Sequence, residues 1–144
     1  MHSSVGVTDA TGFVAVDDTN KLIILSYRGS SSLSNWIGNI NIDFNAFAPC
    51  SGCQVHRGFL SSWNDSKDRV KAALSQAKAD HPDYSIIFTG HSLGAAISTL
   101  AAAELRQQGY NVALVSGVCS TIFPTTNITT VYLRLPNGGQ QRLC

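Results

Sequence analysis

Hydrophobic positions alternate with polar ones near the start of the chain. Two β-rich runs, Thr11 to Val16 and Lys21 to Tyr27, are separated by Asp17-Asp18-Thr19-Asn20. Aspartate and asparagine favour tight turns because their short side chains bond to the nearby backbone. The pattern therefore predicts a β-hairpin.

A helical period replaces this alternation further along. An amphipathic helix is predicted up to about Asp80, and Pro82 stops it. Its apolar positions are Phe59, Trp63, Val70, Leu74 and Ala77. The strand-like run 85–89 follows, and a run from Ala95 to Gln108 that is apolar nearly all round predicts a buried helix closed by Gly109.

The run Val112 to Val115 predicts the next parallel strand. Strand, helix and strand in this order predict an α/β architecture. After Ser116 the chain changes character, because residues 117–144 contain no acid, no histidine and no lysine. A strand over Thr129 to Leu135 is the one further element suggested there.

A short helix is predicted between the hairpin and the amphipathic helix that ends near Asp80. Leu33, Trp36, Ile37 and Ile40 fall at i, i+3, i+4 and i+7, which places them on one helical face. This spacing fits an ordinary surface helix docked on the core or a mobile amphipathic flap. Spacing alone favours the surface helix.

Composition narrows the possible partners. The chain is 44% hydrophobic and 13% charged, with a net charge of +1, so no basic field is available to hold nucleic acid. The longest uncharged runs break well short of a membrane span, and no signal peptide is expected at the start. The low charge is typical of a piece of a larger core.

Cys50 and Cys53 form a C-x-x-C within a loop rich in proline, serine and glycine. A thioredoxin-like motif would open a helix after a strand, and a zinc site would need a second ligand pair, which is not visible. We expect a small structural disulfide and an oxidising compartment, with free buried thiols as the alternative. No metal and no cofactor are expected. The pairing of Cys119 and Cys144 is left open.

The strongest chemical signal is Gly90-His91-Ser92-Leu93-Gly94, between the strand-like run and the buried helix. G-x-S-x-G in a strand–turn–helix context is the signature of a nucleophile elbow. Ser92 would stand at the tip of a sharp turn that leaves no room for side chains at Gly90 and Gly94. The N–H groups at the start of the helix would stabilise an oxyanion there.

The usual partners of such a serine do not follow it. Hydrolases of this type place an acid and then a histidine after the nucleophile. Downstream of Ser92 the chain has one carboxylate, Glu104, and no histidine. The four histidines, His2, His56, His81 and His91, all precede Ser92.

From about Gly6 to Val115 the chain resembles the secreted class 3 lipases of filamentous fungi, a branch of the α/β-hydrolases that includes feruloyl esterases. The resemblance rests on several collinear motifs beside the elbow. They are Thr11-Gly12-Phe13, Arg28-Gly29-Ser30, Asn35-Trp36-Ile37-Gly38-Asn39, Cys50-Ser51-Gly52-Cys53, His56-Arg57-Gly58-Phe59 and His81-Pro82-Asp83-Tyr84. It implies a partial α/β-hydrolase fold, a mixed sheet with a nucleophile elbow.

The resemblance also implies roles. Ser92 would be the nucleophile, with Ser30 and the N–H of Leu93 as oxyanion donors. Residues Leu33 to Ile40 match the family's lid, which raises the flap interpretation above the surface helix. Cys50 and Cys53 match a local disulfide. Neither His56 nor His91 matches the triad histidine, and His91 is the variable residue of the elbow.

The departures from the family define the expected domain organisation. Residues 1–116 are expected to form a partial lipase-like domain, and residues 117–144 a divergent tail that does not match the family. The resemblance implies a secreted ester hydrolase acting on a lipid or other ester at an interface, impaired here because the triad acid and histidine are missing. The alternatives are an inactive fragment, a lipid-interface binding protein, and an unrelated α/β binding protein with a chance elbow.

Overall fold

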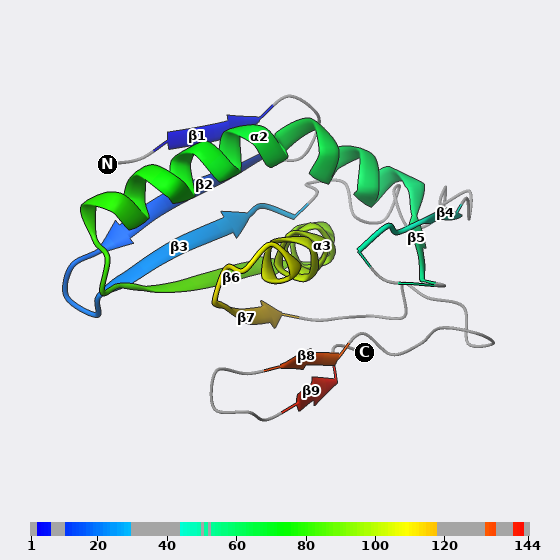
Figure 1. Cartoon of the computed structure of the whole chain (residues 1–144). Helices are drawn as coiled ribbons and strands as arrows, with labels where there is room; N and C mark the ends of the chain where they lie inside the picture. Colours follow the sequence, from blue (N-terminus) through cyan, green and yellow to red (C-terminus); the bar gives the residue numbers. More distant parts are fainter. Residues whose placement is uncertain are drawn as a thin grey trace.

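A computed structural model describes residues 3–6, 11–29, 44–49, 51, 53–117, 132–134 and 140–142 of the chain. A five-stranded sheet has the order β1-β2-β3-β6-β7 and is covered by two helices (Figure 1). Its strands are β1 (Ser3–Gly6), β2 (Thr11–Asp17), β3 (Leu22–Tyr27), β6 (Ser85–His91) and β7 (Val112–Gly117). The helices are α2 (Arg57–Asp80) and α3 (Leu93–Gln107).

The sheet is mixed, as expected for an α/β-hydrolase-like domain. β1, β2 and β3 pair antiparallel, whereas β3, β6 and β7 pair parallel. The predicted hairpin is confirmed as β2 and β3, and Lys21 in its turn has a φ of 56°. The carboxyl ends of β3, β6 and β7 therefore meet at one edge, where Tyr27 and Ser116 both lie beside Gly90.

Alternation along the strands builds the core. In β3 the side chains of Ile23, Leu25 and Tyr27 are buried, and the residues between them are half-buried. Leu25 lies beside Val14 on one side and Phe88 on the other. Helix α3 packs on β3, β6 and β7, while α2 packs on β1, β2 and β3 and beside α3. The chain thus buries one continuous face between the sheet and the two helices.

The predicted helices are confirmed with small shifts at their ends. α2 ends at Asp80 as expected, and its buried positions include Ser66, a polar residue within the apolar stripe. α3 begins at Leu93, directly after the elbow serine and two residues before the apolar run, and ends one residue before Gln108. Gly109 follows with a φ of 93°, the left-handed conformation that commonly ends helices. β6 continues to His91 and β7 to Gly117, two residues beyond the predicted ends in each case.

Two small antiparallel sheets complete the described chain. One pairs β4 (Phe44–Ala46) with β5 (Gln54–His56), in a segment that the sequence presented as a loop. The other pairs β8 (Tyr132–Arg134), inside the predicted strand Thr129 to Leu135, with β9 (Gln140–Arg142). Strands of three residues carry too little alternation to be recognised from their pattern.

Candidate active site

Ser92 occupies a sharp turn between β6 and α3. Its backbone angles are φ 57° and ψ −122°, in a region that non-glycine residues rarely adopt. Such a conformation costs about 1–3 kcal/mol and persists only where the surroundings enforce it. The predicted elbow conformation is therefore confirmed. Strain of this kind at a polar residue is typical of functional sites.

The glycines on either side of Ser92 enforce the turn. A Cβ atom on Gly90 would lie 2.3 Å from the carbonyl carbon of Gly94, and a Cβ on Gly94 would lie 2.1 Å from the carbonyl oxygen of Tyr27. Both obstacles are backbone atoms, which cannot rotate away as a side chain can. The first turn of α3 is thus pressed between the end of β6 and the end of β3.

A third glycine completes the contact with β3. A Cβ atom on Gly29 would lie 2.9 Å from the carbonyl oxygen of His91 and 3.6 Å from the Cβ of Ser92. Arg28 donates its backbone N–H to Thr11 at 2.7 Å, which fixes the chain just after β3. The Arg28-Gly29 segment therefore lies directly against the elbow, as the proposed oxyanion role of the next residue, Ser30, requires.

Within the described residues, hydrogen bonding at the start of α3 uses the carbonyl of Ser92 and no capping bond from its hydroxyl. The carbonyl of Ser92 accepts from the N–H of Ala95 at 3.0 Å and of Ala96 at 3.2 Å. The side chain of Ser92, which is half-buried, makes no capping hydrogen bond. The N–H of Leu93 belongs to the first turn of a helix, whose amides have no partner within the helix. A hydroxyl beside such amides and the positive end of a helix dipole suits oxyanion chemistry.

A buried hydroxyl ties α3 to β6 below the elbow. Ser98 is fully buried and donates its Oγ–H to the carbonyl of Thr89 at 2.7 Å. Thr99, the next residue, instead bonds within the helix, to the carbonyl of Ala95 at 2.8 Å. Ser98 is not among the site residues predicted from the sequence. A serine in a helix that is apolar nearly all round was the signal for a buried polar contact.

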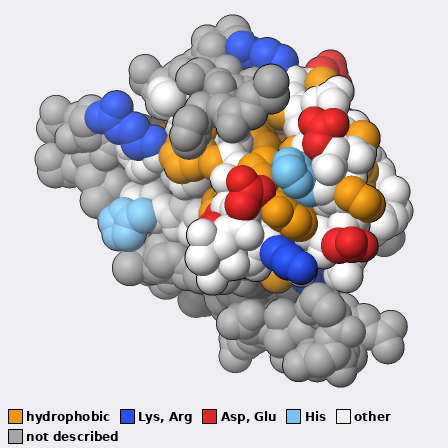
Figure 2. Space-filling model, turned by 90° about the vertical axis from the view of Figure 1, so that its left-hand side faces the viewer, with side chains coloured by type: hydrophobic (Ala, Val, Ile, Leu, Met, Phe, Trp, Pro, Cys, Tyr) orange, Lys and Arg blue, Asp and Glu red, His pale blue; other side chains and the backbone are white. Residues whose placement is uncertain are grey.

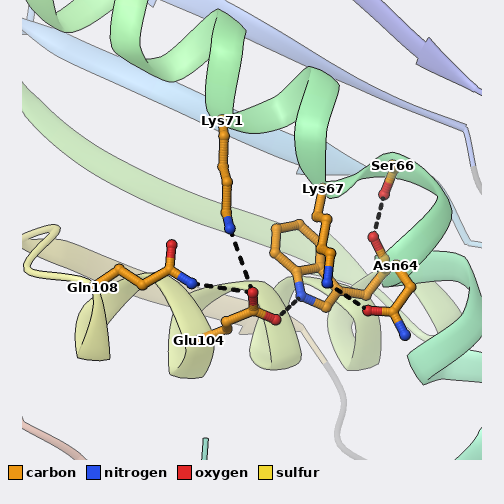
Figure 3. A network of polar contacts seen from close by, with 7 residues as sticks. Asn64, Ser66, Lys67, Lys71, Glu104 and Gln108 are labelled. Atoms are coloured by element: carbon orange, nitrogen blue, oxygen red, sulfur yellow. Dashed lines mark hydrogen bonds and ion pairs between the residues drawn. The ribbon is translucent and has the colours of Figure 1, made fainter.

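Two further buried groups hold α2 in place. The indole N–H of Trp63 donates to a carboxylate oxygen of Glu104 on α3 at 2.6 Å. Figure 3 shows the carboxylate of Glu104 at the centre of a network that also includes Lys71 at 3.5 Å and Gln108 at 3.2 Å. Glu104 is thus a link between the two helices, with its carboxylate occupied by Trp63 and Lys71.

The second buried group is the phenol of Tyr27, whose oxygen lies 2.6 Å from Oγ of Ser66. Ser66 itself donates to the carbonyl of Ser62 at 2.9 Å, so the phenol donates to Ser66. Burial of the ring raises the pKa of Tyr27. This bond anchors the end of β3, whose backbone meets Gly94, to helix α2.

The described histidines occupy positions in the framework of the fold. His56 precedes α2, where its Nδ1 accepts from the N–H of Gly58 at 3.1 Å and its ring lies 4.6 Å from that of Phe59. His81 follows the end of α2 and stacks on Tyr84. His91 is exposed at the end of β6. His2 lies outside the described residues.

Several predicted site residues also lie outside the described part of the chain. They are Ser30, the lid residues Leu33, Trp36, Ile37 and Ile40, and Cys50. Cys53 is buried and disulfide-bonded, and its pairing with Cys50 stays a prediction. Within the described residues, no group of three or more His, Cys, Asp or Glu side chains could hold a metal ion, and no helix has the length and apolar character to cross a bilayer.

A cavity of about 530 Å³ lies at the opposite end of the strands from Ser92. It is lined by apolar side chains of β2 and α2, such as Val14 and Ala73, and by Asp18, Asp80 and His81. Figure 2 looks onto this end of the molecule, where hydrophobic side chains lie among carboxylates and a histidine. The cavity is separate from the elbow.

Comparison with known proteins places the chain among lipases. A profile of the family described as Lipase (class 3) matches residues 24–125. A Penicillium cyclopium protein named secreted mono- and diacylglycerol lipase A is 41% identical over 104 residues, which cover 72% of this chain and 34% of that protein. A Fusarium solani protein named secreted mono- and diacylglycerol lipase 1 is 43% identical over 76% of this chain and 33% of its own length.

Solved structures agree with the sequence comparison. A mutant form of MDLA from Penicillium cyclopium superimposes with a TM-score of 0.73 at 37% identity, over 77% of this chain and 43% of that one. Rhizomucor miehei triacylglyceride lipase gives 0.73 at 34% identity, over 81% and 46%. The chain spans about a third of the length of the curated Penicillium and Fusarium lipases that it matches. The chain belongs to the class 3 lipase family.

Proposed function

We propose that this chain carries the nucleophile of a lipase-type carboxylic ester hydrolase. Ser92 attacks the ester carbonyl, the C–O bond to the alcohol breaks, and the resulting acyl-enzyme is hydrolysed by water. The observation that carries the proposal is the backbone of Ser92, held at positive φ by glycines that admit no side chain. A hydroxyl free of capping bonds stands there at the start of a helix.

The oxyanion would be held by two donors. The N–H of Leu93 lies at the start of α3, and Ser30 follows the Arg28-Gly29 segment that packs on the elbow. Loss of one oxyanion donor typically costs about 3–4 kcal/mol of transition-state stabilisation. The lid role of Leu33, Trp36, Ile37 and Ile40 is part of the same proposal. It rests on family resemblance.

The substrate class and compartment follow from the relatives. Proteins named secreted mono- and diacylglycerol lipases match the chain, so we propose a lipid ester as substrate and secretion as the destination. The disulfide at Cys53 supports an oxidising compartment. We retain residues 1–116 as the lipase-like unit and residues 117–144 as a divergent tail. Neither nucleic acid nor a cofactor is part of the proposed chemistry.

The 144-residue polypeptide should be a weak catalyst. No histidine follows Ser92, and the described histidines are committed to helix ends or exposed at the strand end. Enzymes that lose their triad retain about 10³–10⁴-fold catalysis over water, from the oxyanion hole and binding alone. We therefore propose that the 144 residues carry the nucleophile but not the general base that would activate it.

Covalent labelling tests the nucleophile directly. The protein is incubated with an alkyl fluorophosphonate and imidazole, so that Oγ of Ser92 bonds to phosphorus, fluoride leaves and imidazole takes the proton. Peptide mass spectrometry should find the label on Ser92, at a rate that rises with imidazole concentration. A Ser92→Ala variant should remain unlabelled. Label spread over other serines, or no label on Ser92 at any imidazole concentration, would disprove the role.

A further inference from the structure

We infer that Ser98 is a positioning residue for Ser92: its hydroxyl fixes α3 against β6 at the base of the elbow. The inference rests on the proposed function, because the geometry it preserves is that of the proposed nucleophile. It starts from the bond between Oγ of Ser98 and the carbonyl of Thr89, at 2.7 Å. Ser98 does not touch the reacting atoms, so it acts through the backbone.

This bond joins two residues on either side of the elbow and so restricts the backbone around Ser92. Thr89 immediately precedes Gly90, and Ser98 lies one helical turn beyond Gly94, so the bond closes a loop of ten residues around Ser92. Among the described residues it is the one side-chain hydrogen bond between α3 and β6, and its donor, Ser98, is fully buried. Water therefore does not reach the hydroxyl of Ser98 to replace the bond.

The rest of the joint depends on contact alone. The N–H groups of Ala95 and Ala96 reach back to the carbonyl of Ser92, but these bonds belong to α3 itself. Gly90 and Gly94 have no side chains, so β6 and α3 can lie in close contact. The absence of a side chain permits this contact but supplies no attraction between the two elements. A directional bond across the joint is needed to fix the helix in register with the strand.

The register matters because the two proposed reacting groups lie at this joint. Oγ of Ser92 and the N–H of Leu93 are adjacent, and Gly29, in the segment after β3, packs directly against Ser92. A small slide of α3 along β6 would move the first two relative to the third. Misplacement by about 1 Å can cost about 100-fold in rate. The hydroxyl of Ser98 would therefore affect the chemical step rather than substrate binding.

The test compares two neighbouring hydroxyls in the full 144-residue protein. Ser98→Ala removes the bond to β6, and Thr99→Ala removes a bond that stays within α3 and serves as the matched control. The maximal labelling rate and the half-saturating concentration of the fluorophosphonate are measured separately, at fixed imidazole. A Ser98→Thr variant keeps the hydroxyl and tests rescue.

For Ser98→Ala we expect the maximal labelling rate to fall about tenfold, with half-saturation unchanged, since one buried hydrogen bond is worth roughly that factor. Thr99→Ala should label at the parent rate, and Ser98→Thr should recover most of the loss. A parent rate in Ser98→Ala, or an equal loss in Thr99→Ala, would overturn the inference. If Ser98→Ala does not fold, Ser98→Cys, with its weaker donor, is assessed by the same criteria.

Amide exchange separates this inference from the proposed function. If the parent protein is never labelled at Ser92, the proposed nucleophile fails, but the positioning role still makes a prediction. The amides of Ala95 and Ala96, which bond to the carbonyl of Ser92, should exchange faster in Ser98→Ala than in Thr99→Ala. Equal exchange in the two variants would overturn the positioning role independently of any chemistry.

Discussion

The two edges of the parallel strands are built in opposite ways. At the amino-terminal edge, polar groups satisfy one another: Lys78 donates to the carbonyls of Pro82 and Tyr84, and the phenol of Tyr84 donates to Asp18 at 2.9 Å. At the carboxyl edge, glycines press the backbone together and Ser92 is held at positive φ.

The two edges of the sheet therefore differ in role: one carries ordinary surface contacts, and the other carries the proposed nucleophile. The amino-terminal edge uses exposed and half-buried side chains whose polar contacts near the surface contribute little each. The carboxyl edge stores strain at Ser92, whose hydroxyl makes no capping bond to α3. Substitutions should therefore be costly at the carboxyl edge and in the buried links behind it, and nearly silent at the amino-terminal edge.

The largest effect is expected at Gly94. Gly94→Ala places a Cβ 2.1 Å from the carbonyl oxygen of Tyr27, and since backbone must move, we expect a loss of at least about 3 kcal/mol in unfolding free energy. Urea denaturation measures it. Gly109→Ala, at the other end of α3, meets open space and should cost only about 1 kcal/mol, for its positive φ. Similar midpoints for the two variants would contradict the close packing at the elbow.

The next largest effect is expected at the link between the helices. Trp63→Phe removes the indole N–H that donates to Glu104, and should cost about 2 kcal/mol, because a buried bond to a carboxylate is lost together with ring contacts. Glu104→Gln keeps an acceptor for the indole and should cost less. The two variants are compared by chemical denaturation. A greater loss in Glu104→Gln than in Trp63→Phe would show that the bond to Lys71 is the important one.

A smaller effect is expected at Tyr27. Tyr27→Phe should cost about 1 kcal/mol at neutral pH, since Ser66 keeps its bonds to backbone carbonyls. Burial raises the pKa of Tyr27 above that of the unfolded chain. The protonated phenol therefore adds stability below the unfolded pKa, and this is lost as the pH rises through the folded one. Denaturation curves at neutral and alkaline pH should show less alkaline loss in the variant, and equal loss would contradict burial of the phenol.

The smallest effect is expected at the hairpin turn of the amino-terminal edge. The side chain of Asn20 donates to Asp17 at 2.7 Å and, with the backbone N–H groups of Asn20 and Thr19, lowers the pKa of Asp17. Asn20→Ala should raise that pKa toward its ordinary value. A lowered carboxyl pKa favours the folded state above the unfolded pKa, and the contribution disappears as the pH falls. NMR titration of Asp17 measures the shift, and an unchanged titration would exclude the side-chain bond.

The sequence predicted the parts of this arrangement that carry periodic signals. The hairpin, both helices and the elbow follow from spacing and from the glycines around Ser92. The hydrogen bonds of Ser66 and Ser98 could not be predicted from the sequence. Their partners, Tyr27 and Thr89, lie on other elements and are identified only once the chain is folded. Each serine is a polar residue in an apolar stripe, which indicates a buried partner without identifying it.

Hydrolysis of a p-nitrophenyl ester by the purified 144-residue protein, with and without imidazole, tests the central claim most directly. We expect turnover barely above background without imidazole, equal to that of Ser92→Ala, and, after the hydrolysis that imidazole catalyses by itself is subtracted, a rise with imidazole in the parent protein alone. An equal rise in both proteins would show that Ser92 is not the nucleophile. Robust turnover without imidazole that Ser92→Ala abolishes would contradict the missing base, and His56 would then be the first residue to substitute.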